Sequence, residues 1–245
     1  MVGKALTLLT GLGEHPKGAS ASELARGVGY PLSTAHRLLA ALVRDGYAKF
    51  DQSTKRYSLG LRVFQLAQNV SRSQGFSGLA TPILDQISVT TREATMLAVL
   101  DGERQLYVYC NAGPQQVSVV GEPGKHGPLY CTSQGKVLIA FSAPDIREYL
   151  LRRLTLEPMG PNTITDRNEL RHEIERVRAR GYAIADEEHE AGIRAIGVPV
   201  LNHEHLVAAI ATAAPAYRIS LDQLREHLPT LTAAAAELAV VMPRS

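Results

Sequence analysis

Residues 20–60 read SASELARGVGYPLSTAHRLLAALVRDGYAKFDQSTKRYSLG, and this stretch decides how the N-terminal part of the chain folds. The run Ser20–Glu23 is a capping box, in which the serine hydroxyl accepts the amide of the glutamate at the start of a helix. Gly27 and Gly29 supply a tight turn after this short helix. A longer helix is predicted to begin near Pro31, because the fixed φ of proline suits a first helical turn. The short capped helix, the glycine turn and the longer helix together predict a helix-turn-helix.

Apolar residues at helical spacing indicate what this domain buries. In a helix ahead of the pair they are Val2, Ala5, Leu6, Leu9 and Leu12. In the helix after Pro31 they are Ala35, Leu38, Leu39 and Leu42, and the opposite face holds Ser33, Thr34, His36, Arg37, Ala40, Ala41 and Arg44. We therefore expect three helices, the third with a slim polar face.

That polar face has the chemistry of a DNA reader. A helix in the major groove presents its N-terminal turns to base edges. Arg37 can form two hydrogen bonds with guanine, whereas Ser33 and Thr34 can reach a phosphate or a base. The alternative is a three-helix scaffold whose polar face is merely solvated.

A basic hairpin after the third helix favours DNA binding over that alternative. Residues 47–50 and 56–59 alternate as two short strands, and residues 51–55 join them. This pattern predicts a β-hairpin wing for a winged helix-turn-helix over residues 1–60. The DNA-binding candidates on the helix and the wing are Ser33, Thr34, His36, Arg37, Arg44, Lys49, Lys55 and Arg56.

The charge distribution agrees with a polyanion partner at one end of the chain. Residues 1–60 carry eight Lys and Arg against four acids, a net charge of +4. The rest of the chain carries 18 basic against 20 acidic residues, a net charge of −2. A basic small domain on a mildly acidic large one suits double-stranded DNA at the N-terminal end.

Residues 61–76 are predicted to form a linker helix. Its apolar positions make a face broader than one small domain needs: Leu61, Val63, Phe64, Leu66, Ala67 and Val70. We expect this face to contact a second subunit, although packing on its own domain is the alternative. A homodimer or a homotetramer is therefore expected.

Residues 77–245 are predicted to form one α+β domain with an antiparallel sheet flanked by helices. Strands are expected at 95–100, 105–110, 116–121, 182–186, 193–200 and 206–213, with a glycine- and proline-rich loop at 121–128. Helices are expected at 79–90, 133–141 and 144–153, from the Asp166 cap to Gly181, and from the Ser220 cap to about residue 242.

The whole pattern resembles the IclR family of bacterial transcription regulators. The resemblance rests on residues 4–9, 33–39 and 57–60, on Ser133-Gln134-Gly135-Lys136, and on GYAIADEE at 181–188 followed by GIRAIG at 192–197. It implies a winged helix-turn-helix, a linker helix and a GAF-like effector-binding domain. It also implies a repressor of a catabolic or metabolic operon that binds a palindromic operator as a dimer or dimer of dimers.

The family resemblance also implies an effector pocket between the sheet and the Ser-x-Gly-Lys turn. The matching positions are Val119, Ser133, Gln134, Ala185, Ile193, Ala195, Ala211 and Ala213, to which we add the adjacent Cys131 and Gly135. Family members with defined acid pockets carry Asp, Cys or Ser where this chain has its four alanines. A less polar, roomier pocket is expected, for a small effector with an aromatic or branched apolar body and a polar or acidic end, which the amides of the 133–136 turn would meet.

Other functions are less well supported by the sequence. Ser133 and Lys136 match the Ser-x-x-Lys pattern of penicillin-binding enzymes, but their partner motifs are missing, and no P-loop is present. The acidic run at 186–190 and the pair His203 and His205 lack metal-ligand spacing. An enzyme on the C-terminal domain, or a DNA-binding protein without an effector, are the alternatives.

Composition completes the set of expectations. The chain has two cysteines, no long apolar run and no signal pattern at its start. We expect a reduced, cytoplasmic setting, a buried inert thiol at Cys131 rather than an oxidant sensor, and no catalytic residue, cofactor, metal or membrane partner.

Overall fold

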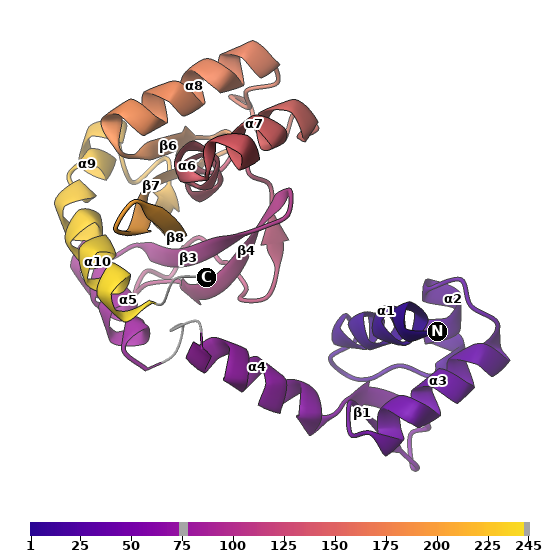
Figure 1. The fold of residues 1–245 in the computed structure, drawn as a ribbon. Helices are drawn as coiled ribbons and strands as arrows, with labels where there is room; N and C mark the ends of the chain where they lie inside the picture. Colours follow the sequence, from indigo (N-terminus) through magenta and orange to yellow (C-terminus); the bar gives the residue numbers. More distant parts are fainter. Residues whose placement is uncertain (74–77, 243–245) are drawn as a thin grey trace. The chain divides into compact units, whose positions relative to one another are not determined.

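The computed structural model describes residues 1–73 and 78–242, and it divides the chain into two compact units, Met1–Ser71 and Arg72–Ser245 (Figure 1). The N-terminal unit contains α1 (Val2–Gly13), α2 (Ala21–Gly27), α3 (Leu32–Arg44), β1 (Ala48–Asp51) and β2 (Arg56–Leu59). The helix α4 (Leu61–Ser73) follows directly and is grouped almost entirely with this unit.

The helix-turn-helix forms as the local signals predict. The Ser20 side chain accepts the Glu23 amide, and the Glu23 side chain accepts the Ser20 amide, so the capping box at the start of α2 is complete. Gly29 has a φ of +69°, in the left-handed region that glycine adopts without strain. Pro31 stands at the N-cap of α3, whose buried residues are Ala35, Leu38, Leu39 and Leu42.

The predicted inner face of α1 is partly wrong. Leu8 and Leu12 are buried, whereas Val2 and Leu6 are exposed. The helix therefore packs on α2 and α3 through a face rotated toward Leu8, since only one stripe of an amphipathic helix can face a small core.

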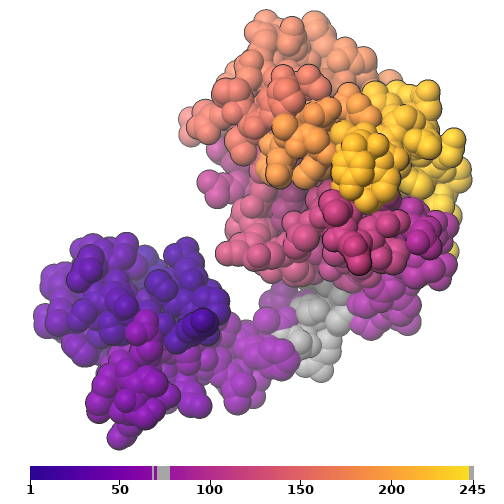
Figure 2. Space-filling model, turned by 180° about the vertical axis from the view of Figure 1, so that it is seen from behind, coloured from indigo at the N-terminus to yellow at the C-terminus, as the bar shows by residue number. Residues whose placement is uncertain are grey.

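The hairpin of β1 and β2 is antiparallel, and Figure 2 shows it projecting from its unit as a purple lobe. The rings of Phe50 and Tyr57 pair across it with centroids 4.7 Å apart. The Tyr57 amide and carbonyl both bond to Ala19, which joins the hairpin to the helices. Gly60 then lies so close to the backbone of Gly46 that a Cβ atom would meet its carbonyl oxygen at 2.2 Å.

The C-terminal unit contains a six-stranded sheet in the order β5-β4-β3-β8-β7-β6, and every neighbouring pair is antiparallel. The strands are β3 (Ala94–Asp101), β4 (Arg104–Asn111), β5 (His126–Gly127), β6 (Ala183–Asp186), β7 (Ile193–Asn202) and β8 (His205–Pro215). The helices are α5 (Ala80–Thr91), α6 (Ser133–Phe141), α7 (Pro144–Arg153), α8 (Arg167–Arg180), α9 (Leu221–Arg225) and α10 (Leu228–Val241).

Helices cover both faces of this sheet, so the strands alternate between two cores. Leu97 and Ile210 face the core beneath α5 and α10, whereas the neighbouring Ala98 and Ala209 face the core beneath α6, α7 and α8. At the end of strand β7, the Asn202 side chain donates to the carbonyl of Met242, the residue that caps the C-terminus of α10. The unit is α+β, as predicted from the sequence.

Three predictions about the C-terminal elements need correction. Residues 116–121 form no strand, because they cross the sheet face instead of pairing with an edge. The predicted loop at 121–128 contains the short strand β5. The predicted final helix is two helices, because Pro229 has no amide hydrogen and its ring would clash with the carbonyl one turn earlier.

None of the helices within residues 1–73 and 78–242 combines the length and apolar character that a membrane crossing requires.

Candidate functional site

The exposed face of α3 carries the predicted base-reading residues. Ser33, His36 and Arg37 are exposed and Thr34 is half-buried, while the apolar side of the helix is anchored in the core. The structure shows no ion pair or hydrogen bond of the Arg37 guanidinium within the described residues. Its donors can therefore meet a partner without breaking an existing contact.

The basic residues around α3 and the wing differ in how they are held. Lys49 and Lys55 are exposed on the hairpin. Arg44 forms an exposed ion pair with the adjacent Asp45 at 2.9 Å. Arg56 donates to the Gly18 carbonyl at 3.0 Å and to Glu23 at 3.1 Å, so its guanidinium is already used to join the wing to α2.

A cavity of about 360 Å³ lies on the sheet face near the start of α6. It is lined by Met96, Tyr107, Val119, Val120, Gly121, Glu122, Lys125, Cys131, Thr132, Ser133, Gln134, Ala185, His189, Glu190, Ile193, Ala195 and Ala213. Its volume falls within the range of roughly 300–1,000 Å³ that small-molecule sites occupy.

The first turn of α6 presents polar groups to this cavity. Thr132 caps the helix by accepting the Gly135 amide at 3.0 Å. The Ser133 and Gln134 side chains are buried, with 1% and 4% of their surface exposed. The Ser133 hydroxyl and the Gln134 amide nitrogen have no hydrogen-bond partner in the described part of the chain. A buried polar atom without a partner is costly, so both atoms suit a bound ligand.

The floor of the cavity is apolar because of strand register. Ala185, Ala195 and Ala213 lie opposite one another on β6, β7 and β8. Met96 on β3 and Ile193 on β7 also line the cavity. Small side chains in a row across three strands leave space that larger ones would fill.

Two predicted pocket residues do not line the cavity, namely Gly135 and Ala211. Ala211 pairs with Gly197, which lies so close to α6 that a Cβ atom would be 3.2 Å from Ser133. The helix therefore covers this part of the sheet. Gly135 packs on Leu129 so tightly that a Cβ atom would meet its carbonyl oxygen at 2.2 Å.

Several lining residues were not identified from the sequence. Met96 and Tyr107 lie on β3 and β4 with their side chains on the cavity side of the sheet. The alternation of side chains along these two predicted strands could have identified them. Burial raises the pKa of Tyr107 to about 12, so its hydroxyl is neutral and accepts from Gln105 at 2.9 Å. The polar residues Glu122, Lys125, His189 and Glu190 also line the cavity, and only the tertiary fold brings them together there.

Two family models match the chain. The IclR helix-turn-helix domain matches residues 1–52, and the bacterial transcriptional regulator IclR C-terminal domain matches residues 68–240. The chain belongs to the IclR family. It is a DNA-binding transcriptional regulator and not an enzyme.

Curated relatives and solved structures of the IclR family cover nearly the whole chain. HTH-type transcriptional regulator Rv1719 of Mycobacterium tuberculosis is 34% identical over 221 residues, which are 89% of this chain and 83% of the relative. IclR of Thermotoga maritima is 29% identical with a TM-score of 0.78, covering 98% of this chain and 97% of that one. An IclR homolog from Microbacterium hydrocarbonoxydans, complexed with 4-hydroxybenzoate, is 26% identical with a TM-score of 0.84, covering 97% and 98%.

The Ser-x-x-Lys pattern of this IclR-family regulator serves structure. Lys136 is buried and donates to Glu188 at 2.6 Å and to Glu173 at 3.4 Å. The Ser133 hydroxyl makes no hydrogen bond to it, although a serine nucleophile needs its base within reach. Lys136 instead joins α6 to α8 and to the β6–β7 loop.

The remaining candidates for metal or redox chemistry also gain no support. Across the described ranges, no three His, Cys, Asp or Glu side chains are grouped to hold a metal ion. Burial raises the pKa of Cys131 to about 12, which disfavours the reactive thiolate at neutral pH.

Proposed function

We propose that this IclR-family regulator represses a catabolic or metabolic operon, binds a palindromic operator as a dimer or dimer of dimers, and responds to a small aromatic or branched organic acid. The proposal of an effector rests on one observation: the Ser133 hydroxyl and the Gln134 amide nitrogen are buried without a partner in the described chain, beside a largely apolar cavity of about 360 Å³.

The ligand chemistry follows from the two sides of this cavity. The first-turn amides of α6 and the Ser133 hydroxyl would receive a carboxylate, because a helix N-terminus favours an anion. Ala185, Ala195 and Met96 would contact the apolar body. The complex of the Microbacterium hydrocarbonoxydans homolog with 4-hydroxybenzoate, an aromatic acid, supports this class. An open cavity at the alanines disfavours the alternative of a regulator without an effector.

DNA reading would use the exposed face of α3, with Ser33, Thr34, His36 and Arg37 at the major groove and Arg44 at its end. Lys49 and Lys55 would contact phosphates from the wing. Arg56 would contribute through its position, since it is held by Gly18 and Glu23. Two copies of this face would read two half-sites, and a dimer in which α4 contacts a second subunit would supply both.

The test begins with selection of bound sequences from a random DNA pool. An enriched inverted repeat is expected, and a library without any enriched motif would contradict the operator proposal. Affinity for that repeat is then measured by fluorescence anisotropy with and without 4-hydroxybenzoate and a series of branched aliphatic acids. At least one acid should stabilise the protein in a thermal-shift assay and weaken operator binding. Acids that stabilise the protein but leave operator affinity unchanged would contradict the switch.

A further inference from the structure

Residues 112–122 form a strap that crosses one side of the proposed effector pocket, and the inference below rests on that pocket. Val119, Val120, Gly121 and Glu122 of the strap line the cavity. The strap has no helical or strand hydrogen bonds of its own. Something outside the strap must therefore hold it over the cavity.

The two ends of the strap are fixed by close packing. At its start, the Gly113 amide donates to the Asn111 side chain at 2.9 Å, and a Cβ atom on Gly113 would meet the Glu93 backbone at 2.9 Å. Near its end, a Cβ atom on Gly121 would lie 2.7 Å from the Cys110 sulfur. Both glycines lie where a side chain would not fit.

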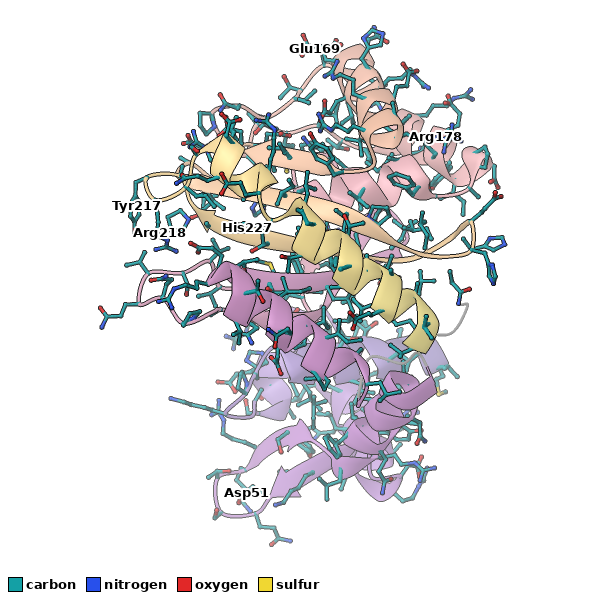
Figure 3. The ribbon with its side chains drawn as sticks, turned by 90° about the vertical axis from the view of Figure 1, so that its left-hand side faces the viewer. Asp51, Glu169, Arg178, Tyr217, Arg218 and His227 are labelled. Carbon is teal, nitrogen blue, oxygen red and sulfur yellow. The ribbon has the colours of Figure 1, made fainter. Side chains whose placement is uncertain are left out.

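Between these ends the strap has a single hydrogen bond to the rest of the described chain. The Arg218 Nη1 atom donates to the Val117 carbonyl at 3.0 Å. Residues 114–120 make no other hydrogen bond or ion pair in the ranges that the structure describes. Figure 3 shows Arg218 beside Tyr217 at the edge of the C-terminal unit.

Arg218 is itself fixed by a buried carboxylate. Its Nε and Nη2 atoms donate to the two carboxylate oxygens of Glu93 at 2.8 and 2.6 Å. The Glu93 carbonyl also accepts the Ser88 hydroxyl at 3.0 Å, which ties it to α5. The guanidinium is thus oriented by Glu93 through Nε and Nη2, and its third nitrogen, Nη1, donates to Val117.

We propose that Arg218 is a latch that holds the strap closed over the pocket, with Glu93 as the residue that positions it. Release of the Arg218–Val117 hydrogen bond lets residues 114–120 move away and opens the cavity to a ligand. The latch sets how fast a ligand enters and leaves. It does so without contacting the ligand, because Arg218 does not line the cavity.

Cys131 provides a readout that needs no ligand. Its side chain lines the cavity and is fully buried, so a thiol reagent reaches it only when the pocket opens. The chain has one other cysteine, Cys110, which Cys110→Ser removes from every variant with little change in side-chain size, so that its packing against Gly121 is kept. Labelling by 4,4′-dithiodipyridine is followed at the same pH for every variant.

In this background, Arg218→Lys is the decisive change. Lysine can still neutralise Glu93, but its single ammonium group cannot bind the Glu93 carboxylate and the Val117 carbonyl at the same time as the guanidinium does. We expect the Cys131 labelling rate to rise about tenfold, which corresponds to losing one hydrogen bond to a charged group. The melting temperature should stay close to that of the parent. Arg218→Ala should show the faster labelling together with a lower melting temperature, because Glu93 is left buried without its cation.

Arg225→Ala is the matched control, since Arg225 is an exposed arginine whose ion pair within the described residues is with Asp222. Its labelling rate should equal that of the parent. An unchanged Cys131 labelling rate in Arg218→Lys would overturn the latch. So would a labelling rate that rises in every variant in proportion to its loss of melting temperature. The assay contains neither DNA nor acid, so its failure is distinguishable from failure of the proposed regulatory function.

Discussion

At the scale of single residues, Arg37 is the side chain on which DNA specificity is expected to depend. It is exposed on α3, and the described chain offers it no competing partner. Arg37→Ala should weaken binding to the selected operator by about 1–3 kcal/mol and relax preference for one base pair. Anisotropy titrations on operator and on random DNA check this. Equal losses on both DNAs would mean that Arg37 contacts only phosphate.

Lys136 is a buried cation whose loss should cost considerable stability. It is 1% exposed and neutralises Glu188 and Glu173, which are also buried. Lys136→Met should lower the free energy of unfolding by about 3–5 kcal/mol, since a buried carboxylate loses its cation. Urea denaturation followed by circular dichroism measures the change. Adding Glu188→Gln should recover part of the loss, and Lys125→Met on the exposed pocket rim should have little effect.

Asp51 at the tip of the wing, labelled in Figure 3, gives a pH dependence. Hydrogen bonds from the hydroxyl and amide of Ser53 and the amide of Thr54 lower its pKa from 3.8 to about 2. Because the folded-state pKa is below the unfolded value, the stabilisation is present above pH 3.8 and is lost as pH falls through about 2. An NMR titration should place the Asp51 midpoint near 2, and Ser53→Ala should raise it. A midpoint near 4 in the parent would contradict the hydrogen bonds.

At the scale of elements, α4 exposes an apolar face beside a small domain. Leu61 and Phe64 are 80% and 60% exposed. If this face contacts a second subunit, Phe64→Asp should shift the protein toward monomer and weaken operator binding, because a charge would enter an apolar interface. Analytical ultracentrifugation checks the mass. His172→Asp on α8 adds the same charge elsewhere and should leave the mass unchanged.

The bounds of helices and strands that are marked by caps or tight turns were predictable from the sequence to within a residue or two. The capped helices α2, α6 and α8, and the β3–β4 hairpin, need only side chains near their own ends. The strap at 112–122 was predicted wrongly, because its alternating pattern resembles that of a strand. Such a segment becomes a strand only if it pairs with the edge of a sheet, and this one does not. The break before α10 was missed although Pro229 marks it.

At the scale of the whole molecule, the proposed regulation requires the pocket and the operator to be coupled. Ala195→Phe should fill the cavity with a ring, so that acids no longer stabilise the protein or change operator affinity. Operator binding without acid should persist, whereas the parent should show a coupling of about 1–3 kcal/mol. Ala179→Phe on the exposed side of α8 is the control. An unaltered acid response in Ala195→Phe would place the effector elsewhere.

The sequence by itself determined the winged helix-turn-helix, the α+β class, and eight of the residues that line the cavity. These follow from caps, turns and periodicity, which act between residues close in the chain, and from motifs that resemble the IclR family. Only the tertiary structure decided that α6 covers Ala211, that Lys136 is paired with Glu188, and that Arg218 reaches Val117. These contacts join segments up to 101 residues apart. No local pattern encodes them, because they depend on strand order and register.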